Sequence, residues 1–264
     1  MPKLRPRLAL LVAGVLLLGA CANDSTDDGD PVDPDTPRLV KADTLTICTT
    51  IGSKPWIFSE DGEIQGFDIE LVELVATKLG VTPEISVQDF AQISTGAVFE
   101  AAKCDIAAAA ITVTEARQQI MSFSDSYFDT NQMLLVLQES PVNGLEDLEG
   151  KRLAVQTDTT GQIYAQAHES EYGYEIVIFE DMPSTVLAVM SDKADAALWD
   201  NAGLIPAVQQ YPETRIAAEY VTGETYAWAM SKNNPGLLKV ANEALSEARQ
   251  DGTYDTIYKK WLSY

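Results

Sequence analysis

Two side chains of opposite charge in this sequence could together hold a zwitterion. Arg117 follows the small and β-branched run Ile106–Val113 and stands three residues after Thr114, a typical helix N-cap. An arginine in a first helical turn opposes the helix dipole, so we expect an anion beside it, although a surface arginine is the simpler alternative. Its planar guanidinium matches a carboxylate in bidentate fashion. Asp200 ends a second apolar run and could bind an ammonium group, or it could cap the helix that begins near Ala202.

The elements around Arg117 indicate a parallel α/β sheet. Short runs of β-branched and apolar residues predict three strands, at Thr44–Thr49, Glu84–Val87 and Ile106–Val113. Helical patterns separate these strands, one closed by Gly80 and one around Ile93–Ala102. The βαβαβ order predicts parallel pairing with right-handed crossovers. Ligands bind at the carboxyl ends of such strands, where Thr112 and Arg117 would lie.

A second α/β pattern follows. It predicts strands at Arg152–Val155, Glu175–Phe179 and Ala194–Trp199, and helices from Thr157–Gly161 through Ala167, at Ser184–Met190, Leu237–Gln250 and Thr253–Leu262. The folded part is therefore an α/β protein in which the alternation of strands and helices occurs in two successive segments.

Three stretches resemble a known family in the same order. Ala110–Arg117 followed by Phe123–Phe128 resembles the family 3 extracellular solute-binding proteins of amino-acid ABC transporters. Gly66–Leu79 resembles the most specific motif of that family, and Gly252–Trp261 resembles its usual C-terminal helix. The likeness runs from about Thr44 to Tyr264.

The resemblance implies the type II periplasmic binding protein fold, in which two α/β lobes are joined by two hinge strands. The first lobe would comprise residues 43–132 and 231–264, and the second lobe, with the hinge strands, residues 133–230. Met133–Leu137 would be the first crossing strand and Tyr226–Met230 the returning one.

The same resemblance assigns the groups that hold a free amino acid. Arg117 and Thr160 would bind its carboxylate, and Thr112 and Asp200 its ammonium group. Thr159 and Thr160 stand at a predicted helix start, where backbone N–H groups cradle anions. We therefore expect one amino-acid ligand between the lobes.

The side-chain pocket would be walled by Phe90 and Trp56, although a buried tryptophan is most often a core residue. Four positions depart from the family pattern. Thr50 stands where family members that bind basic amino acids have an acidic residue, and Ser53 where they often have an aromatic one. Ala110 and Asp158 stand where the family usually has glycine. These departures disfavour a lysine, arginine or histidine ligand. Gln156 points toward a polar neutral side chain, and an acidic ligand stays open.

The N-terminus predicts export and a lipid anchor. Residues 1–20 combine a basic start with the apolar run Leu8–Leu18, which is too short to span a bilayer, as in a signal peptide. Leu18–Cys21 resembles a bacterial lipobox with Cys21 as the lipidated residue, the alternative being an ordinary signal cleaved near Ala22. Residues 21–42 would be a disordered acidic and proline-rich spacer; a calcium loop is disfavoured, because the EF-hand glycine and terminal glutamate are missing. We expect an extracytoplasmic monomer, anchored to the membrane beside its permease subunits.

Composition restricts the other functions. The formal net charge of −22 argues against nucleic acid as a partner, because that surface requires a basic face. The single histidine, His168, cannot supply a multi-histidine metal site, and no nucleophile elbow or P-loop occurs. We expect no cofactor, no metal and no catalysis. Two alternatives stay open: an enzyme like the cyclohexadienyl dehydratases built on this fold, and a ligand-sensing receptor domain.

Two further cysteines could pair in an oxidising compartment. If Thr50 and Ala110 both lie at the ligand edge, Cys104 stands about four residues lower on its strand than Cys48. That offset is roughly 13 Å, too long for a disulfide unless the strand register differs. The pairing stays open.

Overall fold

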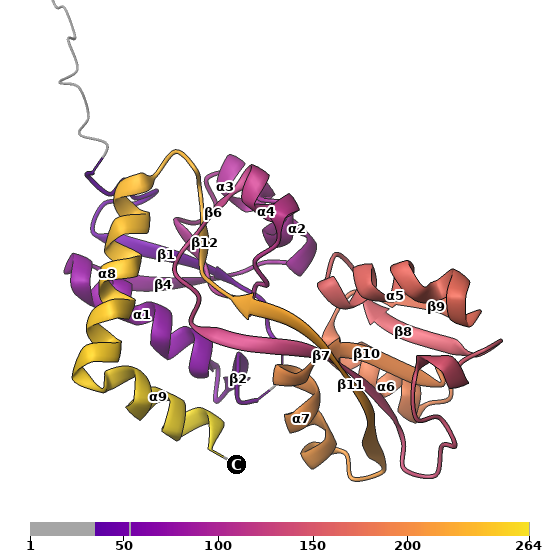
Figure 1. Ribbon diagram of the computed structural model, residues 1–264. Coiled ribbons are helices and arrows are strands. Elements are labelled where there is room, and N and C mark those ends of the chain that lie inside the picture. Colours follow the sequence, from indigo (N-terminus) through magenta and orange to yellow (C-terminus); the bar gives the residue numbers. More distant parts are fainter. Residues whose placement is uncertain (1–34, 53, 264) are drawn as a thin grey trace, which may run out of the picture. The chain divides into compact units, whose positions relative to one another are not determined.

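The computed structural model describes residues 35–52 and 54–263. The predicted signal peptide, Cys21, the first part of the spacer and Ser53 lie outside the described residues. Two five-stranded sheets organise the described chain, each with its own helices (Figure 1). A small hairpin of β2 (Phe58–Glu60) and β3 (Glu63–Gln65) accompanies the first sheet.

The first sheet has the order β4-β1-β5-β12-β6. Its strands are β1 (Thr44–Thr49), β4 (Thr82–Val87), β5 (Ile106–Ala107), β6 (Ser122–Phe123) and β12 (Ala229–Met230). Strand β1 pairs in parallel with β4 and β5, which confirms the predicted βαβαβ unit, and β12 closes the sheet in antiparallel pairing. The core of this sheet is shared with the long helices α1 (Phe67–Leu79), α8 (Pro235–Asp251) and α9 (Thr253–Leu262).

Helix α1 ends as the sequence predicted, with Gly80 in the left-handed region at φ 70. The continuous helix expected around Ile93–Ala102 is wrong. Two short helices, α2 (Phe90–Ser94) and α3 (Ala97–Glu100), occupy this region, and α4 (Glu115–Ile120) follows the ligand stretch. The break falls at Thr95 and Gly96, and Gly96 adopts φ 75, outside the helical region.

The second sheet has the order β11-β7-β10-β8-β9. Its strands are β7 (Phe128–Leu137), β8 (Arg152–Gln156), β9 (Glu175–Phe179), β10 (Ala196–Asp200) and β11 (Thr214–Tyr226). Helices α6 (Met182–Met190) and α7 (Asn201–Gln210) pack in one hydrophobic cluster. Helix α5 (Thr160–Tyr172) and the 3-10 helix η1 (Leu145–Asp147) pack in another. The second sheet is thus covered by helices on both faces, which explains why β8, β9, β10 and the second half of β7 were recognisable as apolar runs.

Two long strands, β7 and β11, run antiparallel to each other and connect the two lobes (Figure 1). The predicted first crossing, Met133–Leu137, is the second half of β7. The predicted return strand Tyr226–Met230 is wrong, because Tyr226 ends β11 and Ala229–Met230 forms β12 of the first sheet. The lobe boundaries drawn from the sequence stay a prediction. We refer to β7 and β11 as the crossing strands.

The stretch Ile106–Val113 is not one strand as predicted. Strand β5 ends at Ala107, and Ala110 takes a left-handed backbone with φ 48. Thr112 then forms an isolated antiparallel bridge with Tyr226. The chain therefore leaves the sheet early and passes beside the end of β11 before it enters helix α4.

Cys48 and Cys104 form a disulfide, with their Cα atoms 5.6 Å apart. The offset inferred from the sequence was wrong because it treated Cys104 as part of a straight strand. Strand β5 begins only at Ile106, and the chain turns at residues 101–103, directly before Cys104. Cys48 pairs with Ala107 in the sheet, and the preceding turn brings Cys104 back within reach.

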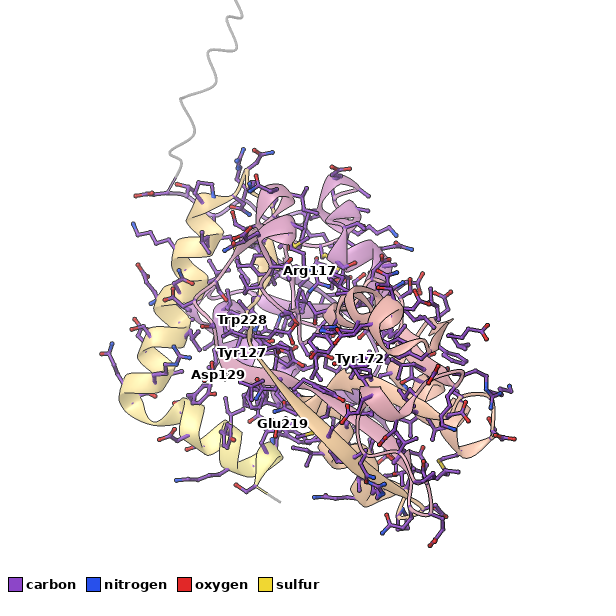
Figure 2. The ribbon with its side chains drawn as sticks, turned by 45° about the vertical axis from the view of Figure 1, so that its right-hand side comes forward. Arg117, Tyr127, Asp129, Tyr172, Glu219 and Trp228 are labelled. Carbon is purple, nitrogen blue, oxygen red and sulfur yellow. A yellow bond between two sulfur atoms is a disulfide. The ribbon has the colours of Figure 1, made fainter. Side chains whose placement is uncertain are left out.

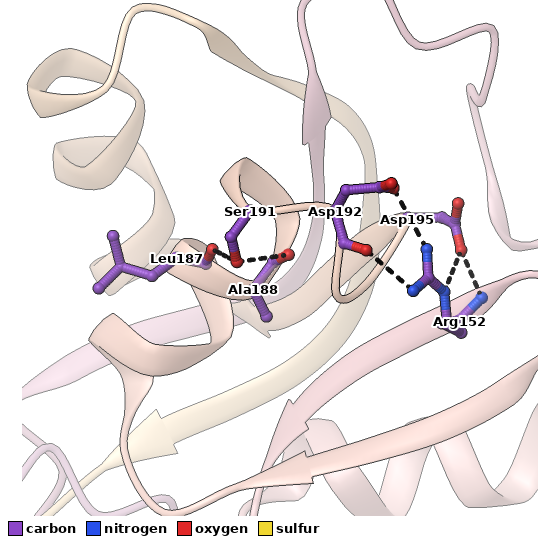
Figure 3. A network of polar contacts seen from close by, with 6 residues as sticks. All are labelled: Arg152, Leu187, Ala188, Ser191, Asp192 and Asp195. Carbon is purple, nitrogen blue, oxygen red and sulfur yellow. Dashed lines mark hydrogen bonds and ion pairs between the residues drawn. The ribbon is translucent and has the colours of Figure 1, made fainter.

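A polar network fastens the second lobe at the amino ends of β8 and β10 (Figure 3). The backbone N–H and Nε of Arg152 both donate to Asp195 Oδ2, at 2.8 and 3.1 Å. Its terminal nitrogens donate to the carbonyl and carboxylate oxygens of Asp192, in the turn after helix α6. The network thus lies at the ends of these strands that are opposite their carboxyl ends, where the ligand cavity opens.

Candidate ligand-binding site

A cavity of about 270 Å³ opens at the carboxyl ends of strands from both sheets. The ten residues predicted to bind the ligand all line it: Thr50, Trp56, Phe90, Ala110, Thr112, Arg117, Gln156, Thr159, Thr160 and Asp200. Residues that the sequence did not single out line it as well: Asp89, Glu180, Asp181, Met182, Trp199 and Gly203. A volume of this size suits a small molecule rather than a peptide.

Arg117 lies in the first turn of helix α4 and lines the cavity; Figure 2 labels it among the side chains of the described chain. Its backbone N–H donates to the N-cap oxygen Thr114 Oγ1 at 3.2 Å, as the sequence predicted. One terminal nitrogen donates to the Thr112 carbonyl at 2.8 Å, and the other donates to the Asp158 carbonyl at 2.7 Å, which belongs to the second lobe. The guanidinium also lies over the ring of Phe90, with its carbon 5.4 Å from the ring centroid.

The charge of Arg117 is largely removed from water, because the residue is 6% exposed. Burial lowers the pKa of Arg117, and the nearby carboxylates of Asp200 and Glu224 oppose that change. A guanidinium has five N–H donors, and the two carbonyls use two of them. The other three donate to no residue within 35–52 and 54–263, so they can serve a carboxylate.

Helix α5 points its N-terminus at the same cavity. Thr159 is its N-cap, and its Oγ1 accepts from the backbone N–H of Gln162 at 3.2 Å. The hydroxyls of Thr160 and Thr112 lie 3.4 Å apart, one from each lobe. The first N–H groups of a helix have no partner within the helix and carry partial positive charge, so this end of the cavity is built for an anion.

Asp200 supplies the opposite charge, from the carboxyl end of β10. It is 6% exposed, and its carboxylate accepts from Gln132 Nε2 and from the Tyr226 hydroxyl, both at 2.5 Å. Burial raises the pKa of Asp200 to about 7; Glu224 also raises it, while Tyr226, Gln132 and Arg117 lower it. Asp200 occupies the N-cap position of helix α7, but its side chain makes no capping hydrogen bond. The capping alternative is therefore wrong for the carboxylate.

Aromatic residues form the walls. The ring of Phe90 lies beneath the Arg117 guanidinium. Trp56 lines the cavity but is only 5% exposed, and its ring packs edge-on against Phe67, Phe128 and Tyr226. Trp56 thus belongs to the core of the first lobe as well as to the cavity wall.

Gln156 and Trp199 form a polar and aromatic corner on the second lobe. The Trp199 indole donates to Gln156 Oε1 at 3.1 Å, and Gln156 Nε2 donates to the Glu180 carbonyl at 3.2 Å. A Cβ on Gly203 would lie 2.0 Å from the Trp199 ring, so only glycine lets the ring lie against the start of α7. The Gln156 amide is therefore held in one orientation beside the cavity.

Two non-glycine residues near the cavity have a left-handed backbone: Ala110, which lines the cavity, at φ 48, and Asp158, directly before the lining residue Thr159, at φ 57. These are the positions where the sequence departs from the usual glycine of the family that it resembles. Aspartate tolerates this conformation, whereas alanine loses about 1–2 kcal/mol in it. The Ala110 N–H donates to Asp68 Oδ2 at 2.7 Å, so a fully buried carboxylate holds the strained residue in place.

The comparisons with known proteins agree with this geometry. The family model described as bacterial extracellular solute-binding proteins, family 3, matches residues 45–264. The chain belongs to this family. The glutamine-binding protein GlnH of an ABC transporter from Bacillus subtilis is 30% identical, over 97% of this chain and 96% of that protein. A probable histidine-binding protein of Campylobacter jejuni is 29% identical, over 96% of each chain.

Solved structures give the same picture of the fold. An ancestral arginine-binding protein bound to arginine superimposes with a TM-score of 0.79 at 34% identity, covering 83% of this chain and 98% of its own. An ancestral arginine-binding protein bound to glutamine also gives 0.79 at 34% identity, covering 85% of this chain and 100% of its own. The predicted fold class, two α/β lobes joined by two strands, is confirmed. Membership in this extracellular family also implies an extracytoplasmic location.

The resemblance to the family did not single out the residues on the crossing strands that surround Asp200. Gln132, Glu224 and Tyr226 surround Asp200 without lining the cavity. Gln132 ends the polar stretch Asp129–Gln132 before the apolar run Met133–Leu137, so no local signal set it apart, and none marked the other two. Asp68 lies in the recognised family motif, but its bond to Ala110 follows only from the structure.

Other sites have little support in the described parts of the chain. His168 lies on helix α5, where its Nδ1 is 2.8 Å from the Tyr164 carbonyl and its ring packs on that tyrosine, outside the cavity lining. Within residues 35–52 and 54–263, no group of three or more histidine, cysteine or acidic residues could hold a metal ion. No helix in those ranges is long and apolar enough to cross a membrane.

Proposed function

We propose that this chain is the ligand receptor of an amino-acid ABC importer, and that it binds one polar amino acid between its two lobes without converting it. The observation that supports this most is a pair of opposite charges across one cavity. Arg117, from the first lobe, and Asp200, from the second, are each 6% exposed and both line the cavity. The relatives named above are binding proteins for glutamine, histidine and arginine.

In this proposal the ligand carboxylate lies between Arg117 and the N-terminus of helix α5. The three spare donors of the guanidinium and the first N–H groups of the helix would satisfy both carboxylate oxygens. Thr160 Oγ1 and Thr112 Oγ1 stand on either side of the junction between the lobes and can complete the hydrogen bonds.

The ligand ammonium group would bind Asp200, with Thr112 as a further acceptor. A zwitterion then neutralises charges on both lobes only when the lobes are closed on it. Such differential contact lets a ligand shift an open–closed equilibrium, which is the property that a transport receptor needs.

The charged residues that line the cavity restrict the class of ligand side chain that it can hold. Among the described lining residues, Arg117 is the one cation, whereas Asp89, Glu180, Asp181 and Asp200 are acidic. With Arg117 committed to the main-chain carboxylate, a ligand with an acidic side chain would meet like charges. We therefore favour a neutral polar side chain that pairs with the fixed amide of Gln156, and of the two classes expected from the sequence we set aside the acidic one.

We further propose that Cys21 carries a lipid that holds the protein beside its permease. The lipobox-like Leu18–Cys21 supports this. In cells, the wild-type protein should fractionate with membranes, and Cys21→Ala should appear in the soluble extracytoplasmic fraction or as uncleaved precursor. Unchanged processing and membrane attachment of Cys21→Ala would contradict the lipid anchor but not the ligand-binding proposal.

The binding proposal is tested by screening the twenty amino acids for thermal stabilisation of the folded chain. A ligand at a hundred times its Kd should raise the free energy of unfolding by about 2.7 kcal/mol. Neutral polar amino acids should stabilise most, and calorimetry should then show one site. Stabilisation by lysine and arginine alone would contradict the proposed side-chain class, and no stabilisation by any amino acid would contradict the function.

The enzymatic alternative has its own test. Purified protein is incubated with prephenate and with arogenate, and phenylpyruvate and phenylalanine are measured. We expect neither product above the rate of the uncatalysed reaction. Multiple turnovers would refute the view that the chain binds without conversion.

A further inference from the structure

Asp200 is held by side chains that belong to both crossing strands. Gln132, on β7, donates to its Oδ1 at 2.5 Å, and Tyr226, at the end of β11, donates to its Oδ2 at 2.5 Å. Each carboxylate oxygen therefore has its own donor, and the two donors come from the two strands that connect the lobes.

Neither donor is placed to touch a ligand. Gln132 and Tyr226 are both 0% exposed, and neither lines the cavity. The Tyr226 ring is fixed by Trp56 and Phe128, at centroid distances of 5.7 and 5.9 Å. Both therefore act on a ligand indirectly. Their short hydrogen bonds go to Asp200, and Gln132 Nε2 also lies 3.3 Å from Thr160 Oγ1, at the other end of the site.

A second carboxylate shares the same amide. Gln132 Nε2 also donates to Glu224 Oε2 at 2.8 Å, so one NH₂ group lies between two acids. The charged and titratable groups around Asp200 are Arg117 from helix α4 and Glu224 and Tyr226 from β11. Arg117 and the two hydrogen bonds favour the ionised carboxylate, whereas burial and Glu224 oppose it.

We propose that Tyr226 and Gln132 are positioning residues that keep Asp200 ionised and directed at the ligand's ammonium group, and that Glu224 works against them. The proposal rests on the amino-acid-binding function proposed above. A protonated Asp200 cannot neutralise an ammonium ion, so the balance among these groups sets the pH range in which the protein holds its ligand.

Tyr226→Phe tests this with little change of shape. The ring keeps its packing, and Asp200 Oδ2 loses a hydrogen bond that favours its charge. A one-unit rise in the pKa of Asp200 would weaken affinity about tenfold at pH 6 and leave it nearly unchanged at pH 8.5. Glu224→Gln removes the opposing charge, so it should act in the other direction and extend tight binding to lower pH.

The experiment is a calorimetric titration, between pH 5.5 and 8.5, of wild type and variants with the amino acid that stabilises most in the screen. Tyr220→Phe is the matched control, because Tyr220 lies on the same strand and its hydroxyl accepts from the Leu145 N–H at 2.9 Å, outside the cavity lining. It should leave the pH profile unchanged. Circular dichroism and urea unfolding at each pH confirm that the variants are folded.

Opposite shifts of the binding midpoint in Tyr226→Phe and Glu224→Gln support the proposal. An equal loss of affinity at every pH in Tyr226→Phe, with no shift in Glu224→Gln, overturns it and leaves Tyr226 a structural residue. If Tyr226→Phe does not fold, the shift in Glu224→Gln decides. If the wild type binds none of the twenty amino acids, the proposed function fails and this inference with it; if it binds but the midpoints coincide, the inference alone fails.

Discussion

Replacing Asp200 with asparagine should stabilise the folded protein while it weakens ligand binding. The Asp200 carboxylate is 6% exposed, and burial raises its pKa from 3.8 to about 7. A raised carboxyl pKa means that the folded state binds the proton more tightly than the unfolded chain does. Each unit of difference corresponds to 1.36 kcal/mol, so about three units amount to roughly 4 kcal/mol.

The sign follows from the order of the two pKa values. Below pH 4 the carboxyl group is protonated in both states, and the group adds no pH dependence. Between pH 4 and 7 only the unfolded state loses the proton, so stability falls as pH rises, and above pH 7 the full penalty is present. Asparagine cannot ionise, so the advantage of Asp200→Asn should grow with pH and level off near pH 8.

The measurement is urea unfolding of both proteins, without added ligand, at several pH values from 4.5 to 8.5. Asp195→Asn is a control of opposite sign. Burial raises the pKa of Asp195, but hydrogen bonds and charge from Arg152 outweigh this and lower it. Asp195→Asn should therefore be less stable than wild type by a nearly constant amount over this range, because a carboxyl pKa lowered below 3.8 affects the pH dependence only in more acidic solution. A stability difference between Asp200→Asn and wild type that does not change with pH would refute the reasoning about the buried carboxylate.

Three further outcomes are expected. Arg117→Ala should weaken ligand binding by about 3–5 kcal/mol in calorimetry, and Arg117→Lys should restore only part of it because the planar fork is lost; normal affinity of the alanine variant would place the carboxylate elsewhere. Cys48→Ala/Cys104→Ala should lose about 4 kcal/mol of unfolding free energy in urea, given the sequence separation of 56 between the cysteines, and an unchanged midpoint would contradict this. Gly203→Ala should displace the Trp199 ring, costing about 1–3 kcal/mol and also affinity, and a wild-type melting curve with wild-type affinity would disprove the close contact.

Much of the fold could be predicted because its local signals agree with its tertiary structure. Strand Thr44–Thr49 and helix Thr253–Leu262 have the predicted bounds, since a buried strand and an amphipathic helix each show their period in the sequence. Thr112, Arg117 and Asp200 could be predicted because ligands bind at the carboxyl ends of such strands, whatever the exact strand lengths, and a predicted helix start indicated Thr159 and Thr160. The residues of the side-chain pocket were assigned from the resemblance to the solute-binding family. All ten lie on one cavity, although their roles stay a prediction.

The secondary-structure predictions fail where a contact between residues remote in sequence determines the backbone conformation. The alanine-rich run after Ile106 has the composition of a buried strand, but it leaves the sheet at Ala107 because Asp68 holds the N–H of Ala110. Strand β11 was missed for a similar reason. Its alternation is interrupted by register shifts at Ile216/Ala218 and Tyr220/Glu224, and most of it is neither fully buried nor fully exposed. Pairing with β7, which is remote in sequence, determines its length.

Asp200 shows why the sequence left two roles for one residue. An aspartate directly before a helix is a common N-cap, and losing a cap costs about 1 kcal/mol. Helix α7 begins without that side-chain bond, because the carboxylate is turned to Gln132 and Tyr226 at the cavity. The protein thus gives up a local stabilising bond and accepts a buried charge at the same residue. The missing cap and the buried charge both destabilise the fold, and Arg117 places an opposite buried charge across the cavity. Selection for a charged ligand explains this arrangement better than stability of the fold does.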